Sequence, residues 1–199
     1  MIIYKSILFR TLFNKERNFM RVITGTARGR RLITLEGEDV RPTTDRVKEA
    51  LFSIIQFEIE GRKILDLFAG SGQLGIEALS RGAKSAVFVD LSKKSVEVVK
   101  QNLESTGLGK NAIVLNTDSI AFAASRADRY DIAFLDPPYR TGLLQKALPL
   151  TANIMNEGGV IICEAPFDEE LPEEAGSFKM TKEYKYGKIK LVTYRFEEK

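Results

Sequence analysis

The sequence predicts an α/β fold built on a mostly parallel sheet, and three observations carry this prediction. Strand-like and helix-like segments alternate from residue 62 onward. An apolar run ends in Asp66, turns on glycines and continues as an amphipathic helix. Near the C-terminus, two strand-like runs flank Gly187-Lys188, which is a hairpin signal. Right-handed β-α-β crossovers give a parallel sheet, and the final hairpin should extend it with antiparallel strands.

The pattern places each element of this fold. Strands are expected near 63–68, 85–90, 111–116, 130–135 and 158–163, helices near 73–81, 92–106, 119–126 and 142–154, and the last hairpin over 178–186 and 189–196. Short β-branched runs around glycines predict a first hairpin over 21–35. A helix follows Pro42, and its buried stripe is expected to contain Val47, Ala50, Leu51, Ile54 and Ile55. Arg46 and Lys48 fall off this stripe and are expected on the surface.

Composition excludes several function classes. The 199 residues are 44% hydrophobic, enough for one core, and no apolar run approaches the roughly 20 residues of a membrane span. We therefore expect a soluble, cytoplasmic protein. It has no histidine and a single cysteine, Cys163, inside an apolar run that predicts a buried thiol. Zinc sites and histidine-based nucleophilic catalysis are therefore not expected.

Charge is unevenly distributed along the chain. The net charge is +3, yet residues 1–35 hold eight basic side chains and one acidic one. The first hairpin presents Arg28, Arg30 and Arg31, which are suited to phosphate contacts. This pattern favours a polyanionic partner, and the alternative is a solvated basic tail.

Three segments are predicted. Residues 1–19 precede a second methionine, Met20, and are interpreted as an extension outside the working domain or as a targeting segment. Residues 20–60 form a hairpin and a helix that bind the partner and close the site. Residues 61–199 form the catalytic domain.

Acidic residues follow successive predicted strands, at Asp66, Asp90, Asp118 and Asp136. Because the carboxyl ends of parallel strands line the ligand crevice of such a sheet, we expect these four carboxylates to form one site. Gly70, Gly72 and Gly75 fit the G-x-G-x-x-G pattern, and Asp90 stands where an acid accepts ribose hydroxyls. These features allow either NAD or S-adenosylmethionine.

The stretch Asp136-Pro137-Pro138-Tyr139 favours a methyl donor. Asp136 and the Pro137 carbonyl offer two acceptors beside the flat ring of Tyr139. A planar amino group on a nucleobase needs this arrangement, because each N–H finds an acceptor while the ring stacks. The stretch resembles the (D/N)-P-P-(Y/F) motif of amino-methyltransferases.

The order of motifs resembles the Class I S-adenosylmethionine-dependent methyltransferases. From Met20 to the C-terminus the chain is similar to the RsmD family, on the stretches 20–30, 41–52 and 66–83 together with D-P-P-Y. That family comprises bacterial 16S rRNA (guanine-N2)-methyltransferases. The resemblance implies a Rossmann-like, mostly parallel seven-stranded sheet with an antiparallel C-terminal hairpin. It also implies 16S rRNA or the assembling small ribosomal subunit as partner. No metal is expected, and a monomer is the default for an oligomeric state that the sequence leaves open.

The resemblance also implies roles for individual residues. The cofactor would be bound by Asp66, Gly70, Gly72, Asp90, Asp118 and Ser119. The guanine amino group would be held by Asp136 and the Pro137 carbonyl, with Tyr139 stacked on the base. Thr43 and Arg46 would help close the site, and Arg28, Arg30 and Arg31 would bind rRNA phosphates.

Other functions stay open at this point. D-P-P-Y also fits an adenine-N6 or glutamine methyltransferase, although no separate target-recognition domain is visible. An NAD-dependent oxidoreductase would use the glycine loop and Asp90 but leave D-P-P-Y without a role. A non-catalytic RNA-binding module is the third alternative.

Overall fold

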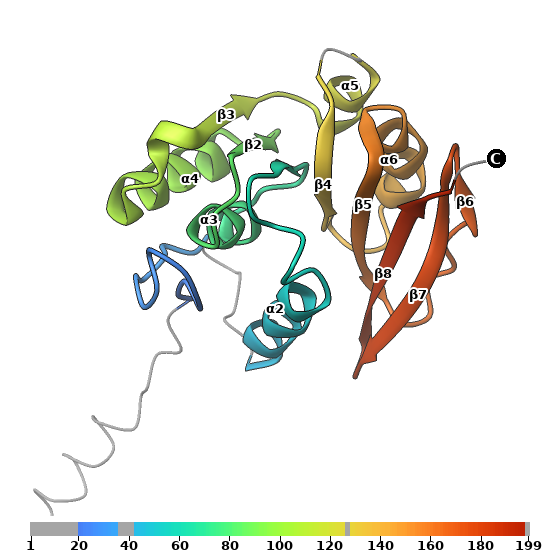
Figure 1. The fold of residues 1–199 in the computed structure, drawn as a ribbon, viewed down its shortest axis with the longest axis horizontal. Coiled ribbons are helices and arrows are strands. Elements are labelled where there is room, and N and C mark those ends of the chain that lie inside the picture. Colours follow the sequence, from blue (N-terminus) through green and yellow to red (C-terminus); the bar gives the residue numbers. More distant parts are fainter. Residues whose placement is uncertain (1–19, 36–41, 126–127, 198–199) are drawn as a thin grey trace, which may run out of the picture.

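The fold is a single twisted sheet covered by helices on both faces (Figure 1). The computed structural model describes residues 20–35, 42–125 and 128–197, with side chains of the first helix described from Arg46 onward. The strands are β1 Lys63–Asp66, β2 Ser85–Asp90, β3 Ala112–Asn116, β4 Tyr130–Leu135, β5 Met155–Pro166, β6 Glu174–Ala175, β7 Phe178–Tyr186 and β8 Ile189–Phe196. The helices are α2 Pro42–Ile54, α3 Gln73–Ser80, α4 Lys93–Thr106, the 3₁₀ turn η1 Gly109–Asn111, α5 Ser119–Ala124 and α6 Leu143–Ala152.

The predicted topology is confirmed. The strand order is β3-β2-β1-β4-β5-β8-β7-β6. Strands β1 to β5 pair in parallel, and β8 and β7 add antiparallel strands after β5. The sheet has eight strands and not seven, because the two-residue strand β6 pairs with the outer edge of β7. From β1, the strands β2 and β3 follow on one side and β4 and β5 on the other, so the strand order reverses between β1 and β4. Folds of this type bind their ligand at this point.

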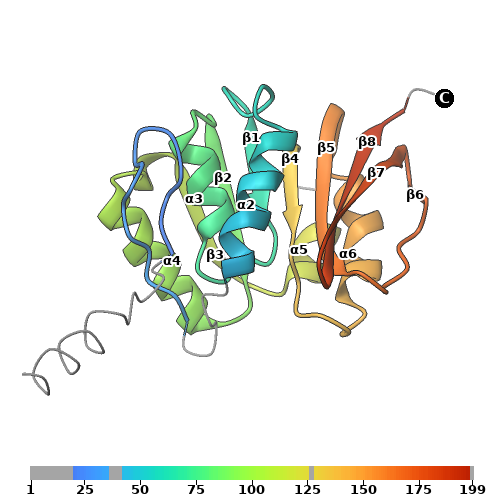
Figure 2. The same cartoon turned by 90° about the horizontal axis from the view of Figure 1, so that it is seen from below.

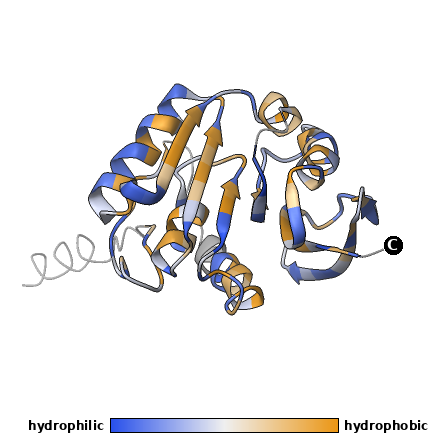
Figure 3. Ribbon diagram, turned by 45° about the horizontal axis from the view of Figure 1, so that its top comes forward, coloured by the Kyte–Doolittle hydropathy of each residue, from blue (hydrophilic) through white to orange (hydrophobic). Residues whose placement is uncertain are grey.

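Two hydrophobic cores lie on opposite faces of the sheet. Alternate residues of a strand serve opposite faces, so Ile64 joins the core under α2, α3 and α4, whereas Leu65 joins the core under α5 and α6. Figure 2 shows α2 and α3 in front of the strands, and Figure 3 shows hydrophobic strands between helices with hydrophilic outer faces. Cys163 is buried in the second core as predicted, and this burial raises the pKa of its thiol.

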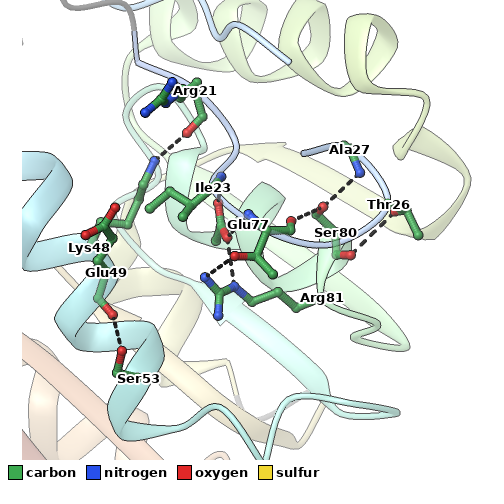
Figure 4. Close-up of polar contacts among 11 residues, drawn as sticks. Arg21, Ile23, Thr26, Ala27, Lys48, Glu49, Ser53, Glu77, Ser80 and Arg81 are labelled. Carbon is green, nitrogen blue, oxygen red and sulfur yellow. Dashed lines mark hydrogen bonds and ion pairs between the residues drawn. The ribbon is translucent and has the colours of Figure 1, made fainter. Parts of the chain in front are cut away.

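The first hairpin is present but much shorter than regular strands would be. Its two arms share one isolated bridge, Arg21 to Arg31. The reason is that side chains of α3 and α4 form hydrogen bonds with backbone groups that would otherwise pair between the two arms. Glu77 accepts the N–H groups of Ile23 and Thr24, at 2.7 and 3.0 Å (Figure 4). Asn102 accepts the N–H of Ile33 at 2.7 Å and donates to its carbonyl.

The prediction that Lys48 lies on the surface is wrong. It was expected on the surface of α2, but it is only 3% exposed. Its Nζ donates to the carbonyl of Arg21 at 2.8 Å, so the ammonium ties α2 to the N-terminal segment (Figure 4). A buried charge needs such a partner, and the partner comes from a segment distant in sequence. Arg46 is exposed as expected.

Some predictions lie outside the described residues. These are the extension over 1–19 and the side chain of Thr43. Within the described ranges, no helix combines the length and the apolar character needed to cross a membrane. The same ranges contain no cluster of three or more acidic or cysteine side chains placed to bind a metal ion.

Candidate active site

A cavity of about 770 Å³ opens at the carboxyl ends of the parallel strands. Its walls come from the loops after β1, β2, β3 and β4, together with Leu35 of the N-terminal segment. It therefore lies at the point where the strand order reverses, as expected for this class of sheet. The lining residues are Leu35, Phe68, Gly70, Asp90, Leu91, Ser92, Ser95, Asp118, Ser119, Ile120, Asp136, Pro137, Pro138, Tyr139 and Leu143.

The glycine loop after β1 is held by a carboxylate beneath it. Gly70 and Gly72 adopt positive φ angles of 53° and 78°, which other residues adopt only with strain. Asp66 is 2% exposed and accepts the N–H of Gly75 at 2.9 Å. Burial is the main reason that the pKa of Asp66 rises to about 7, and the nearby charge of Asp90 adds to it while the Gly75 bond opposes it. Asp66 therefore stabilises the conformation of the glycine loop.

Asp90 connects the first two loops. One of its oxygens accepts the N–H of Gly70 at 2.8 Å, and the other accepts the N–H of Ser92 at 2.8 Å. Ser92 caps α4 as predicted, since its side chain accepts from the N–H of Ser95. The carboxylate therefore sits at the cavity wall with its position fixed by two backbone groups. It still has lone pairs for a ligand hydroxyl.

Asp118 and Ser119 form the wall after β3. Asp118 caps α5 by accepting the N–H of Ala121 at 2.8 Å, and Ser119 donates to the carbonyl of Leu67 at 2.6 Å. The apolar side chains of Phe68, Leu91 and Ile120 lie on the same cavity. This wall offers flat and apolar contacts next to polar groups, which suits a heteroaromatic ring.

The D-P-P-Y segment after β4 forms a further part of the cavity lining. Asp136 is half-buried, Pro137 is buried, and Tyr139 is 44% exposed. The Tyr139 hydroxyl donates to Glu164 of β5 at 2.5 Å. Burial raises the pKa of the Glu164 carboxyl above its ordinary value, and the Tyr139 bond offsets part of that rise. The tyrosine ring is thus held at its hydroxyl end while much of it stays open.

The structure brings most predicted site residues to this one cavity. Gly70, Asp90, Asp118, Ser119, Asp136, Pro137 and Tyr139 all line it. Asp66 and Gly72 do not line it and lie in the loop support behind the wall. Arg28, Arg30, Arg31 and Arg46 are exposed and lie outside the cavity lining.

The comparisons with known proteins agree with this geometry. The family model described as Conserved hypothetical protein 95 matches residues 20–195. The chain belongs to the RsmD family. The Bacillus subtilis protein YlbH is 42% identical over 181 residues, covering 88% of this chain and 98% of the relative. Ribosomal RNA small subunit methyltransferase D of Escherichia coli K12 is 34% identical over 184 residues, covering 89% and 90%.

Solved structures extend the comparison. The Escherichia coli methyltransferase yhhF superposes with a TM-score of 0.79 at 33% identity and covers 91% of this chain and 99% of its own. The Thermus thermophilus 16S rRNA N2 G1207 methyltransferase RsmC, in complex with AdoMet and guanosine, has a TM-score of 0.68 at 26% identity. That match covers 82% of this chain and 45% of RsmC. The Rossmann-like methyltransferase fold is thereby established for this RsmD-family chain.

Sequence reasoning missed two contributors to this site. Glu164 ends an apolar strand run in the same way as Asp66 and Asp90, so the pattern that found those residues also applied to it. Leu35 comes from the N-terminal segment, and no local pattern points to it. Leu35 contributes through a contact that only the tertiary arrangement defines.

Proposed function

We propose that this protein transfers a methyl group from S-adenosylmethionine to the exocyclic N2 of a guanine in 16S rRNA. The observation that carries the proposal is the shared cavity. D-P-P-Y and the glycine loop with Asp90 line the same cavity. Membership in the RsmD family and the name of the Escherichia coli relative support small-subunit rRNA as substrate. The RsmC complex with AdoMet and guanosine supports the donor and the base.

The donor wall fits S-adenosylmethionine. Asp90 provides a fixed carboxylate for ribose hydroxyls, and Gly70 lets the backbone approach the amino acid part closely. Asp118 and Ser119, with Leu91 and Ile120, would contact adenine. Asp66 and Gly72 would contribute by holding the glycine loop in shape, and the buried Asp66 carboxyl would favour the nearby positive charge of the donor's ammonium group.

The acceptor wall positions the nucleophile. When bound, S-adenosylmethionine supplies an electrophilic methyl group on a sulfonium. Asp136 and the Pro137 carbonyl would accept the two N2 hydrogens of guanine, while Tyr139 stacks on the ring and Glu164 holds the tyrosine. This places the nitrogen for in-line attack, in which the new N–C bond forms as the S–C bond breaks. The extra proton on nitrogen then passes to Asp136 or to water.

The exposed arginines would bind the RNA backbone. Arg28, Arg30 and Arg31 lie on the N-terminal segment, which Glu77 and Asn102 fix to α3 and α4. Arg46 and Thr43 of α2 would close the site from the same side. The guanine must leave its stack to enter the cavity, at a cost of a few kcal/mol, partly offset by stacking on Tyr139.

Methyl transfer to small-subunit particles tests the proposal. Particles purified without the modification are incubated with labelled S-adenosylmethionine, and the product nucleoside is identified by mass spectrometry. N2-methylguanosine at one site is the expected product. N6-methyladenosine, or label on protein, would assign D-P-P-Y to another planar amine and overturn the proposal.

A further inference from the structure

A second cavity of about 490 Å³ lies beyond Tyr139, on the side of the β7–β8 hairpin. Tyr139 lines both cavities, so the proposed base-stacking residue forms the boundary between them. The other walls come from the loop after β5 and from the turn between β7 and β8. The residues that matter here are Tyr139, Arg140, Phe167, Asp168, Gly187 and Lys188.

Phe167 presents an aromatic surface in this second cavity. It is 45% exposed, although it is a large apolar side chain at the end of a core strand. Its backbone N–H donates to the carbonyl of Lys188 at 2.9 Å, which ties the backbone at Phe167 to the hairpin turn. The Nζ of Lys185 lies 4.5 Å from the ring centroid. The site thus combines an aromatic ring with cationic neighbours.

The lining of the second cavity carries two positive charges, Arg140 and Lys188, and one negative charge, Asp168. Asp168 is the acidic residue of the lining, and Arg140 pairs with it at 3.2 Å. Within the described residues, no carboxylate lies within ion-pairing distance of Lys188, which is exposed at the hairpin turn. Glu169, the next acid along the loop, accepts a hydrogen bond from Gln145. Once Arg140 is paired with Asp168, the lining keeps the positive charge of Lys188.

The backbone next to Tyr139 has an unusual conformation. Arg140 has a φ of 61°, the left-handed conformation, which is strained for a residue other than glycine. Thr141 donates to the carbonyl of Pro138 at 2.7 Å and stabilises this tight turn. The turn therefore holds D-P-P-Y and the second cavity in a fixed relation.

We propose that the second cavity binds the RNA nucleotide adjacent to the target guanine. Its base would stack on Phe167 and its phosphate would contact Lys188. An aromatic platform with neighbouring cations is how proteins hold splayed single-stranded bases. The proposal rests on the function proposed above, because the guanine in the first cavity fixes which nucleotide enters the second. It gives the β7–β8 hairpin a role in RNA binding, opposite the arginines of the N-terminal segment.

Steady-state kinetics on unmodified small-subunit particles test this site. We expect Phe167→Ala to raise KM for the particle about tenfold, with kcat and the KM for S-adenosylmethionine within about twofold of wild type. Phe167→Trp should restore the KM, whereas Phe167→Leu should not. Phe57→Ala is the matched control, since Phe57 is 93% exposed and lies outside both cavities. Equal KM values for Phe167→Ala and Phe57→Ala would overturn the proposal.

A binding measurement separates this inference from the proposed reaction. Short single-stranded RNAs carry guanine with 2-aminopurine on its 5′ or 3′ side, and quenching of the fluorophore reports stacking. Quenching by wild type that is lost in Phe167→Ala and weakened in Lys188→Ala supports the site, even if particles are not methylated. Methylation of particles with unchanged KM and unchanged quenching in Phe167→Ala would leave the reaction standing and reject the site. Absence of both methylation and quenching in wild type would reject both.

Discussion

The two walls of the catalytic cavity are held in place in different ways. On the donor side, carboxylates bind backbone groups: Asp66 accepts from Gly75, Asp90 from Gly70 and Ser92, and Asp118 from Ala121. On the acceptor side, Tyr139 pairs with Glu164 and Arg140 with Asp168 through their side chains, and one side chain, Thr141, donates to the Pro138 carbonyl.

Under the proposed function, this difference corresponds to the two ligands. A cofactor of constant shape is matched by loops that backbone hydrogen bonds keep fixed. A base delivered by a large RNA meets side chains that lie nearer the surface, such as the 44% exposed Tyr139. The donor wall is therefore a product of the folded sheet, whereas the acceptor wall depends on a few side-chain pairs. The predictions below are ordered from the largest expected effect to the smallest.

Removing the acceptor carboxylate should have the largest effect. Asp136→Ala is expected to lower kcat about 10³-fold, or about 4 kcal/mol, because the amino group loses an acceptor that orients it for attack. Asp136→Asn keeps one acceptor oxygen and should lose less. Single-turnover methylation of small-subunit particles measures both variants. A kcat near wild type for Asp136→Ala would remove D-P-P-Y from the mechanism.

Removing the carboxylate that holds the N-terminal segment on α3 should lower the stability of the fold without changing a residue of the cavity lining. Glu77 is fully buried, accepts from Ile23 and Thr24, and pairs with Arg81 at 2.7 Å. Glu77→Ala should lower the free energy of unfolding by about 3 kcal/mol, since it leaves these donors unpaired. Glu97→Ala, which removes an exposed pair with Lys100, should cost well under about 1 kcal/mol in urea denaturation. Similar losses for the two variants would contradict the described role of Glu77.

The buried carboxyl of Asp66 should make stability depend on pH. Its pKa is raised to about 7 in the folded protein, so the folded state binds its proton more tightly than the unfolded chain does. This contribution is complete below about pH 4 and is lost as the pH rises through about 7, at a cost of roughly 2–4 kcal/mol.

Asp66→Asn should remove that contribution. The pH dependence of the variant's free energy of unfolding is subtracted from that of the wild type. The corrected free energy of unfolding of the wild type should then fall between pH 5 and pH 8. Urea denaturation of both proteins at the two pH values measures the difference. Parallel pH profiles would show that Asp66 titrates in the folded state as it does in the unfolded chain.

Loosening the acceptor wall should have the smallest effect. Tyr139→Phe keeps the ring but removes the hydroxyl that donates to Glu164. We expect kcat/KM to fall about 3- to 10-fold, or about 1 kcal/mol, because the ring is less well positioned. Tyr139→Leu, which also removes the stacking surface, should fall further. Equal kcat/KM values for the two variants would show that the ring itself contributes nothing.

Local patterns predicted the sheet and much of the site. The donor and acceptor loops follow strands whose apolar runs are continuous, and this signal located Asp90 and Asp136 at their strand ends. Glu164 carries the same signal and was overlooked.

Lys48 and the short first hairpin were not predictable in this way. Burial of Lys48 depends on the Arg21 carbonyl, and the hairpin arms bond to Glu77 and Asn102 as well as to each other. These partners are far apart in sequence, so periodicity carries no information about them. The same holds for Phe167, which lies in a loop between predicted strands.

The central claim is that one cavity has separate donor and acceptor walls. Calorimetric titration with S-adenosylmethionine and single-turnover transfer at saturating cofactor test it in Asp90→Ala and Asp136→Ala. We expect Asp90→Ala to weaken cofactor binding about 10- to 100-fold while keeping transfer within about tenfold of wild type, because it removes a charged acceptor for the ribose. Asp136→Ala should bind the cofactor normally and lose transfer. Loss of cofactor binding in Asp136→Ala, or full binding in Asp90→Ala, would contradict the division.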